Sequence, residues 1–386
     1  MTKKMEISEE LRFEGCNLFR QRLIYSLLSG RPVTIIEIRP LDEDPGIKDH
    51  EVKLLGLLER ITNGTKVVIS KTGTQVRFEP GMIHGGAVEF DCGSSRCISY
   101  YLEALLLLAP FCKTPLNVKL TGVTNAWKEI SVDAIRATWL PIFNKFVLND
   151  ENLSIKVNAR GFLPDGGGSI TFTSPIVKTL RPAQRENPGK ICKIRGLAYV
   201  SKVSPSIAQR MIDATKEMLR GYIADVYITV DQRKGASGGN SPGFGIFLTA
   251  ETTEGVFYHG EAMSKPKYVE GDQLIPEDVG KNAAEALLNE IYRGGCLDTS
   301  AQVLAATFMT LTEKNVSKFL FGPLSLYTVQ TLRNLKIFFE HTFKIDEWWK
   351  LHPETENEDA PKIGSTEKAL LTCIGVGYSN LNKVLL

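Results

Sequence analysis

The stretch KDHEVKLLGLLERITNGTKVVIS (residues 48–70) contains the alternation of patterns that decides the fold class. Its apolar side chains recur at helical spacing up to the Asn-Gly pair, which predicts an amphipathic helix over Lys48–Thr62. The β-branched run Lys66–Ser70 that follows the Asn-Gly pair predicts a strand. A helix joined so closely to a strand is typical of α/β layering, in which helices cover sheets.

The same alternation continues outward along the chain. A second helix is predicted to begin at about Ser131, whose hydroxyl can cap the first turn. Short β-like runs lie at Val33–Ile38, Leu116–Leu120 and Ile170–Thr173. The order helix, strand, helix and two strands occurs twice at an offset of roughly 80 residues, and further helices near Thr299–Leu311 and Thr328–Phe339 indicate a third copy. We therefore predict three repeated α/β units.

One part of the chain departs from this repeated order of helices and strands, and its pattern predicts an inserted domain. A helix is expected over Pro205–Arg220 with Ser204 as its cap, followed by a strand over Tyr222–Val230 and a hairpin about Thr253–Gly255. The polar, proline-containing segment Leu351–Gly364 predicts a surface link. The expected domain bounds are 1–185 with 276–345 for the repeats, 186–275 for a small inserted α/β domain, and 346–386 for a C-terminal extension.

The composition is that of a globular protein. The 386 residues are 43% hydrophobic and 23% charged with a formal net charge of +2, which excludes a disordered chain or a polycation but permits a local basic face. The longest apolar run, Tyr101–Phe111, contains Glu103 and is shorter than the ~20 residues of a membrane-spanning helix. The first residues lack the apolar core of a signal peptide. Seven dispersed cysteines indicate reduced thiols in a cytosolic or nuclear setting.

Two glycine-rich loops, Arg160–Ser169 and Gly235–Gly245, could place backbone N–H groups around a phosphate. Neither continues into the Gly-Lys-Ser/Thr run of a phosphate-binding loop, so the patterns favour a tight turn for the first loop and a structural or partner-facing role for the second. The second loop contains Gly-x-Ser-x-Gly around Ser237, but the proline and glycines after it argue against the helix that a nucleophile elbow requires.

The other polar features also have structural interpretations. Asp42 and Asp44 could hold a metal, but a solvated acidic turn is favoured. The five histidines show no metal-ligand spacing, so no zinc site is predicted. Arg333 and Lys336 lie three positions apart on one predicted helical face, which is either solvated or a contact for RNA or a partner. These residues by themselves predict neither a catalytic constellation nor a cofactor.

Several segments, taken in order, carry a family resemblance. They are FEGCNLFRQRLIYSLLSGRPVTI (13–35), RPLDEDPGIKDH (39–50), HGG (84–86), CGSSRCISYYLEALLLLAPF (92–111), GVTNAWKEISVDAI (122–135), RGFLPDGGG (160–168) and GGCLDTSAQVLA (294–305). This series resembles the RNA 3′-terminal phosphate cyclase family over most of the chain, to about Ile345. The resemblance implies three repeated units, each a four-stranded sheet with two helices, and a small domain inserted in the last unit.

Departures from the family pattern begin near the N-terminus. Members with cyclase activity open with a Glu-Gly-Gly-Gly-Gln run, whose Glu and Gln serve the nucleotide site. Aligned on Arg20, this sequence has Phe13 at the Glu position and Asn17 at the Gln position. The resemblance therefore implies a nucleotide site that has lost two of its polar groups.

Two further motifs also lack residues that the family's cyclase reaction uses. The second motif of the family is Arg-x-x-Arg-x-x-Pro-Gly-Leu-x-x-Gln-His. Its first Arg is kept as Arg39, but Asp42 replaces the second and would place negative charge against a phosphate. His50 falls on the motif's Gln, or on its His if one residue is deleted. The family's nucleophile is a histidine, and Tyr327 stands at its position when the downstream FFEHTFKI run is aligned. A phenol with a pKa near ~10 needs an activating base at neutral pH. The resemblance thus implies a pseudoenzyme without cyclase activity.

The chain looks most like the cyclase-like branch of eukaryotes, notably at NSPGFG (240–245). That resemblance implies a non-catalytic ribosome biogenesis factor of the nucleus and nucleolus, within the small-subunit processome and needed for early pre-rRNA cleavages toward 18S rRNA. It also implies a ribosome-assembly GTPase as partner, contact with pre-rRNA, and no membrane. Because no basic run resembles a nuclear-localisation signal, we expect nuclear entry to depend on the partner.

Two alternatives stay open. An RNA endonuclease making one pre-rRNA cut would need a base, an acid and a cation, for which Asp298, Arg333 and Lys336 are candidates. Asp298 could instead cap the helix that follows it. The other alternative is an ATP- or phosphate-binding module without turnover. Its candidate anion contacts are Arg20, Arg39, Arg160 and Gly166–Gly168.

Overall fold

A computed structural model describes residues 10–149, 151–266, 268–351 and 364–381. Most of the segment in which a polar surface link is expected, residues 352–363, lies outside these ranges. Within them, no helix is both long enough and apolar enough to cross a membrane.

The first repeat contains the stretch quoted above. Its elements are β1 (Leu11–Glu14), α1 (Phe19–Ser29), β2 (Val33–Ile36), α2 (Asp49–Ile61), β4 (Lys66–Ile69) and β5 (Val76–Glu79), with the short pair β3 (Thr62–Asn63) and β6 (Met82–Ile83) beside them. The sheet order is β1-β2-β5-β4, and only β1 and β2 pair in parallel. The helix and the strand predicted from residues 48–70 are therefore confirmed.

The second repeat has the same order of elements. They are β7 (Gly85–Asp91), α3 (Ile98–Leu108), the 3-10 turn η1 (Ala109–Phe111), β8 (Thr114–Gly122), α4 (Val132–Ala134), the π-helical segment η2 (Ile135–Trp139), α5 (Leu140–Val147), β9 (Ser154–Ala159) and β10 (Gly168–Ser174). The sheet order is β7-β8-β10-β9. Ser131 caps the helix as predicted, because its hydroxyl accepts a hydrogen bond from the Ala134 N–H at 3.1 Å.

The third repeat is assembled from distant parts of the chain. Its elements are β11 (Gln184–Arg185), the 3-10 turn η4 (Thr299–Ala301), α8 (Gln302–Leu311), β16 (Val316–Phe321), α9 (Leu326–Phe339), β17 (Lys344–Glu347), α10 (Trp348–Leu351) and β18 (Ala369–Ile374). The sheet order is β11-β16-β18-β17. The third copy predicted from the two helices is therefore present.

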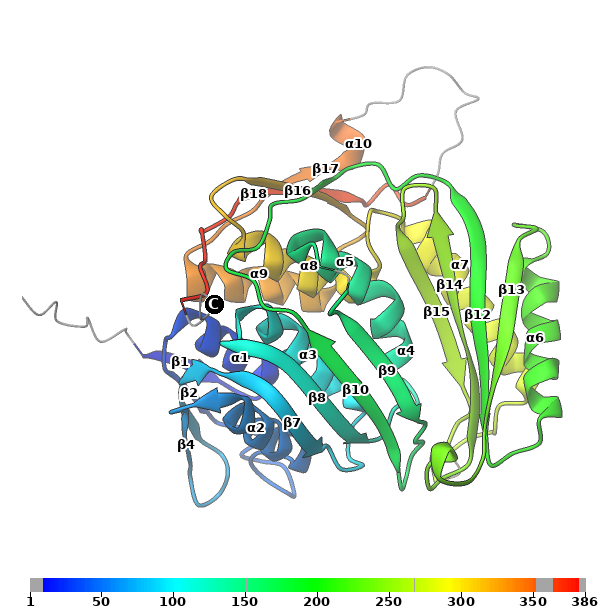
Figure 1. The fold of residues 1–386 in the computed structure, drawn as a ribbon, viewed down its shortest axis with the longest axis horizontal. Helices are drawn as coiled ribbons and strands as arrows, with labels where there is room; N and C mark the ends of the chain where they lie inside the picture. Colours follow the sequence, from blue (N-terminus) through cyan, green and yellow to red (C-terminus); the bar gives the residue numbers. More distant parts are fainter. Residues whose placement is uncertain (1–9, 150, 267, 352–363, 382–386) are drawn as a thin grey trace, which may run out of the picture.

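The inserted unit lies between β11 and η4. Its elements are β12 (Ile191–Ser201), α6 (Ser206–Leu219), β13 (Val226–Arg233), the 3-10 turn η3 (Gly235–Gly238), β14 (Gly243–Thr252), β15 (Phe257–Met263) and α7 (Pro276–Arg293). They form a sheet of order β13-β12-β14-β15, with α6 and α7 packed together. Figure 1 shows this sheet standing beside the three repeats, with its β15 side toward β9 and α4.

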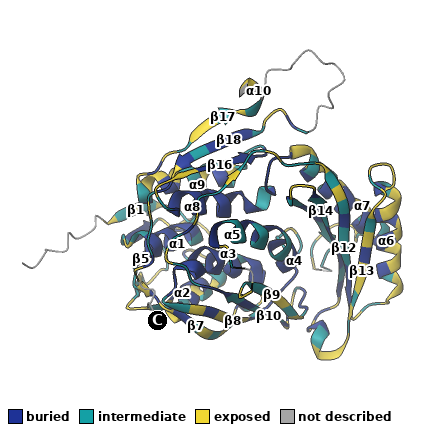
Figure 2. Ribbon diagram, turned by 45° about the horizontal axis from the view of Figure 1, so that its top comes forward, coloured by how far each residue is buried: buried dark blue, intermediate teal, exposed yellow. Residues whose placement is uncertain are grey.

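The core lies where helices of different repeats meet. All ten residues of α8 are buried, and α8 contacts α3, α5 and α9. The burial colours in Figure 2 agree, since the central helices are mostly buried and exposed residues gather on the outer strands and α6. Burial on all sides explains why the apolar run of α3 has no polar stripe. This architecture confirms the predicted α/β class with four-stranded sheets.

The structure differs from the expected bounds of the inserted unit at its end. Helix α7 follows the expected boundary at 275 but packs on β14 and β15. Gly260 permits this close approach, because a Cβ there would lie 2.3 Å from the Leu287 N. The predicted strand Tyr222–Val230 also begins later, at Val226. The helix expected from Pro205 begins at Ser206.

The expected C-terminal extension differs more strongly. Strand β18 lies inside the third sheet, pairing antiparallel with both β16 and β17. Four of its six residues are buried, as expected of an apolar strand between two neighbours, and its last residue, Ile374, is exposed. Residues 369–374 therefore complete the third repeat rather than following it.

Candidate functional site

The position at which the sequence resemblance places the family's nucleophile lies where three helices from different repeats converge. Tyr327 is in the first turn of α9, Arg20 is in the first turn of α1, and Glu103 is in the middle of α3. The Tyr327 hydroxyl donates to Glu103 Oε1 at 2.7 Å and lies 3.0 Å from Arg20 Nη2. Arg20 also pairs with Glu103 Oε2. We call these three residues the Arg20–Glu103–Tyr327 cluster.

Aromatic and basic groups enclose this cluster. The Arg20 guanidinium carbon lies 4.5 Å from the centroid of the Tyr100 ring. The Tyr100 carbonyl accepts a hydrogen bond from Arg20 at 2.8 Å. Arg96 also lies over that ring, at 4.9 Å, and His50 meets its edge at 5.3 Å between centroids. Burial lowers the pKa of His50, so its imidazole is neutral at physiological pH.

Burial and mutual pairing determine the protonation states within the cluster. Burial raises the pKa of the Tyr327 phenol well above its ordinary value of 10.0, and this rise outweighs the opposing effect of Arg20. Burial would lower the pKa of Arg20, but its attraction to Glu103 raises that pKa overall. The phenol is therefore protonated at neutral pH, and the carboxylate placed to accept its proton, Glu103, is already paired with Arg20.

The positions of the family's Glu and Gln also have altered surroundings. Phe13 stacks on Phe338 with ring centroids 5.7 Å apart, and the Arg22 guanidinium lies 4.4 Å from its ring. Asn17 is exposed at the turn before α1. An apolar ring therefore stands where a carboxylate would serve a nucleotide.

In the second motif, the positive charge of Arg39 is neutralised by Glu51. Arg39 makes two hydrogen bonds to the Glu51 carboxylate, at 2.7 and 2.9 Å, and a third to the Gly46 carbonyl. Asp42 is exposed beside it. Asp44 is exposed too and pairs with Lys48, as the acidic-turn interpretation expects. Among the described residues, no group of three or more His, Cys, Asp or Glu could hold a metal ion.

The two glycine-rich loops pack against each other. The Asn240 N–H donates to the Gly166 carbonyl at 2.9 Å, and the Arg160 N–H donates to the Ser237 carbonyl at 2.9 Å. A Cβ on Gly239 would lie 2.4 Å from the Arg160 carbonyl, so the contact requires glycine. These backbone groups join the second repeat to the inserted unit, which accounts for both loops without a phosphate.

Arg160 was expected as an anion contact, but the structure places it inside the same interface. Its side chain is 1% exposed. The guanidinium binds Asp133 at 2.7 Å and Asp231 at 2.7 Å, and it lies over the Tyr199 ring. Because two carboxylates already neutralise it, Arg160 ties the repeats to the inserted sheet instead of facing a ligand.

Arg333 and Lys336 are both exposed on α9, as their spacing predicted. Between them, Asn334 is buried and donates to Gln21 Oε1 at 2.8 Å. Gln21 in turn donates to Thr331, so this side of α9 is hydrogen-bonded to α1. The two cations therefore project from a firmly held helix, and their surface role stays a prediction.

Asp298 lies in a different environment from these cations. It caps η4, accepting from the Ser300 N–H at 2.9 Å, and it binds His259 Nδ1 at 2.8 Å. The capping interpretation is confirmed. Since Asp298 is buried within these contacts, it is not available as a surface base beside Arg333 and Lys336.

The most important residue that the sequence analysis did not single out is Glu103. The available signal was a lone carboxylate in the apolar run 101–111, because a buried charge needs a partner. No spacing rule could identify the partners, which lie 83 and 224 residues away in the chain.

Comparison with known proteins assigns this architecture. The profile of a family described as RNA 3′-terminal phosphate cyclase matches residues 11–345. A Caenorhabditis elegans protein named probable RNA 3′-terminal phosphate cyclase-like protein is 63% identical, with 98% of this chain and 100% of the relative covered. The human protein of the cyclase-like name is 46% identical over 98% of this chain and 99% of its own length. A Schizosaccharomyces pombe relative named as an rRNA processing protein is 37% identical, with 98% and 99% covered.

Proposed function

This chain belongs to the RNA 3′-terminal phosphate cyclase family, and on that premise we propose that it is a non-catalytic rRNA processing factor. The observation that carries the proposal is the Arg20–Glu103–Tyr327 cluster, in which the group at the nucleophile position is a buried, hydrogen-bonded phenol. The name of the Schizosaccharomyces pombe relative supports the rRNA part of the proposal.

Loss of activity fits the geometry of three separate motifs. A cyclase must accept a nucleoside triphosphate and form a bond to its α-phosphorus, so it needs free cations around a nucleophile. Here Arg20 is paired with Glu103 and Arg39 is paired with Glu51. The retained fold with neutralised cations supports a protein that uses the family scaffold for binding instead of phosphoryl chemistry.

The finer parts of the proposal rest on the sequence resemblance to the cyclase-like branch. We place this protein in the nucleus and nucleolus, within the small-subunit processome, where it acts with a ribosome-assembly GTPase in early cleavages toward 18S rRNA. The test is depletion of the protein in cells followed by hybridisation analysis of pre-rRNA. Accumulation of uncleaved precursor with less 18S rRNA is expected, and unchanged precursor would refute the proposal.

A biochemical test addresses the missing activity directly. Purified full-length protein is incubated with α-³²P-labelled ATP and magnesium, then with RNA bearing a 3′-phosphate. Neither a covalent AMP adduct nor a cyclic phosphate should form, with an active cyclase as the positive control. An adduct that disappears in Tyr327→Phe would mean that the phenol has become a nucleophile.

One observation favours a second candidate function, RNA cleavage. Arg333 and Lys336 are exposed together on α9, and paired cations suit contact with RNA phosphates. Asp298 is not available to them as a base, so such a mechanism would draw its base from another group. Purified protein would have to cut pre-rRNA at one position, with loss of that cut in the Arg333→Ala/Lys336→Ala variant.

A further inference from the structure

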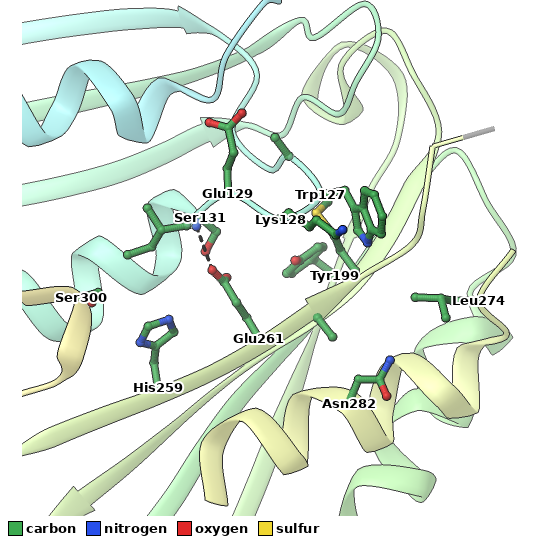
Figure 3. A pocket seen from close by; sticks show the side chains of 14 residues that line it. Trp127, Lys128, Glu129, Ser131, Tyr199, His259, Glu261, Leu274, Asn282 and Ser300 are labelled. Carbon is green, nitrogen blue, oxygen red and sulfur yellow. Dashed lines mark hydrogen bonds between the residues drawn. The ribbon is translucent and has the colours of Figure 1, made fainter. Parts of the chain in front are cut away.

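A cavity of about 410 Å³ lies between the second repeat and the inserted sheet. One wall is the loop 126–131 that precedes α4, and the opposite wall comes from β15 and α7. Figure 3 shows side chains from both units pointing into this space. The cavity is separate from the Arg20–Glu103–Tyr327 cluster, whose residues do not line it.

One lining group has an unmet need for a hydrogen-bond donor. Glu261 Oε1 accepts from the Ser131 N–H at 2.9 Å, the dashed contact in Figure 3. Glu261 Oε2 is buried and has no hydrogen-bond partner among the described residues. A buried acceptor left without a donor is costly, so a ligand that supplies one would be held there. Burial also raises the pKa of Glu261, which a donor from the ligand would reverse.

The same cavity contains a flat aromatic surface with cations beside it. Trp127 lines the wall opposite β15, and the ammonium groups of Lys128 and Lys265 lie 4.4 and 5.6 Å from its ring centroid. The exposed Lys128 side chain can move aside from the ring while its charge stays near. With Lys128 moved from its place over the ring, the indole can stack on a base of single-stranded nucleic acid while the nearby lysines attract its phosphate.

Besides Glu261, the charged groups that line the cavity are Lys128, His259 and Glu129, and Glu129 is already paired with Arg96 at 2.9 Å. Attraction to Asp298 outweighs burial and raises the pKa of His259 to about 9, so its imidazole is protonated at neutral pH. With Lys128 also present, an arginine or lysine entering toward Glu261 would approach two positive groups. A neutral ring carrying an amino group meets the carboxylate without that repulsion.

We propose that this cavity binds one unpaired nucleobase of single-stranded RNA, stacked on Trp127, and that Glu261 selects bases carrying an exocyclic amino group. The inference deepens the proposed function, since it rests on contact between this chain and rRNA. Cytosine and uracil form the sharpest comparison, because they have the same size and differ on one edge. Cytosine carries an amino group at position 4 and an acceptor at N3, whereas uracil carries a carbonyl at position 4 and an N–H at N3.

The test compares full-length protein binding to fluorescent ten-nucleotide oligo(C) and oligo(U) by anisotropy. The unaltered chain should bind oligo(C) about tenfold more tightly, as one added hydrogen bond to a carboxylate predicts. Glu261→Gln keeps an oxygen for the Ser131 N–H and offers an amide donor in place of Oε2. It should therefore abolish or invert the preference, while Glu217→Gln on the exposed face of α6 should preserve it.

A second variant separates stacking from base selection. Trp127→Ala should weaken binding of both oligomers about tenfold and leave their ratio near that of the unaltered chain. Equal affinities of the unaltered chain for oligo(C) and oligo(U), or a ratio unaffected by Glu261→Gln, would overturn the inference. If Glu261→Gln left the ratio of the two affinities unchanged but weakened co-purification of a protein partner, the cavity would bind a segment of that protein instead of a nucleobase.

These outcomes are distinct from those that decide the proposed function. Unchanged pre-rRNA after depletion of the protein refutes a role in rRNA processing, whatever the cavity binds. A processing defect after depletion, combined with no base preference in the purified chain, refutes only the nucleobase site.

Discussion

The Arg20–Glu103 pair allows a quantitative test of a structural role for the Arg20–Glu103–Tyr327 cluster. The side chains are 13% and 9% exposed, so their charges are largely removed from water. Removing one member of such a pair leaves a buried, uncompensated charge and costs about 3–5 kcal/mol. Replacing both members by apolar side chains of similar volume removes that penalty, so the double change is expected to be close to neutral.

We therefore predict that Glu103→Leu and Arg20→Met each lower the free energy of unfolding by about 3 kcal/mol. The double variant should lose only about 1 kcal/mol, far less than the two single losses together. Urea unfolding of the full chain, followed by circular dichroism, measures all four proteins. Glu89→Gln, which disrupts an exposed pair with Lys119, serves as the control and should leave the unfolding midpoint unchanged.

Two results would refute this reasoning. If Glu103→Leu unfolds at the same urea concentration as the unaltered chain, the carboxylate does not compensate a buried charge. If the double variant loses as much as both single variants combined, the two residues act independently, and the cluster is not the unit described here.

Three further predictions follow from other parts of the structure. Tyr327→His combined with Asp42→Arg should yield no AMP adduct in the labelled-ATP assay, because Arg20 stays paired with Glu103. For His259, the folded pKa of about 9 exceeds the ordinary 6.5, so its stabilisation is complete below about pH 6.5 and is lost as the pH rises through 9. The melting temperature should fall over that range, and the fall should be smaller in His259→Gln. Arg160→Met should lower the free energy of unfolding by about 3 kcal/mol. It should also expose the junction of the inserted unit to limited proteolysis, which mass spectrometry of the fragments would detect.

Each of these predictions has a result that contradicts it. Efficient adenylylation by the Tyr327→His/Asp42→Arg variant would show that the nucleotide site is intact. An equal decline of melting temperature in His259→Gln would assign the pH dependence to other groups. Arg160→Met with the stability and cleavage pattern of the unaltered chain would mean that Arg160 does not hold the inserted unit, with the exposed Arg333→Met as the matched control.

The sequence by itself determined the repeated elements, and its family resemblance predicted the changes at the catalytic positions. The helical spacing in 48–62, the Ser131 cap and the third pair of helices are local patterns, and each predicted element is present. Local patterns succeed there because a helix or strand is selected by residues within a few turns of one another. The tyrosine at position 327 could also be read directly, because it depends only on alignment with the family motif.

What only the tertiary structure decided is which charges meet. In the sequence, Arg160 and Arg39 were both candidate anion contacts. The structure buries Arg160 between two carboxylates that lie 27 and 71 positions away in the chain. The place of β18 inside the third sheet could not be read either, because strand pairing depends on contacts between residues far apart in the chain. Docking of the repeats and the inserted unit brings Glu103 to Tyr327, and Glu261 to the loop that holds Trp127. Sequence spacing carries no information on such distant partners, whereas the packed fold determines them.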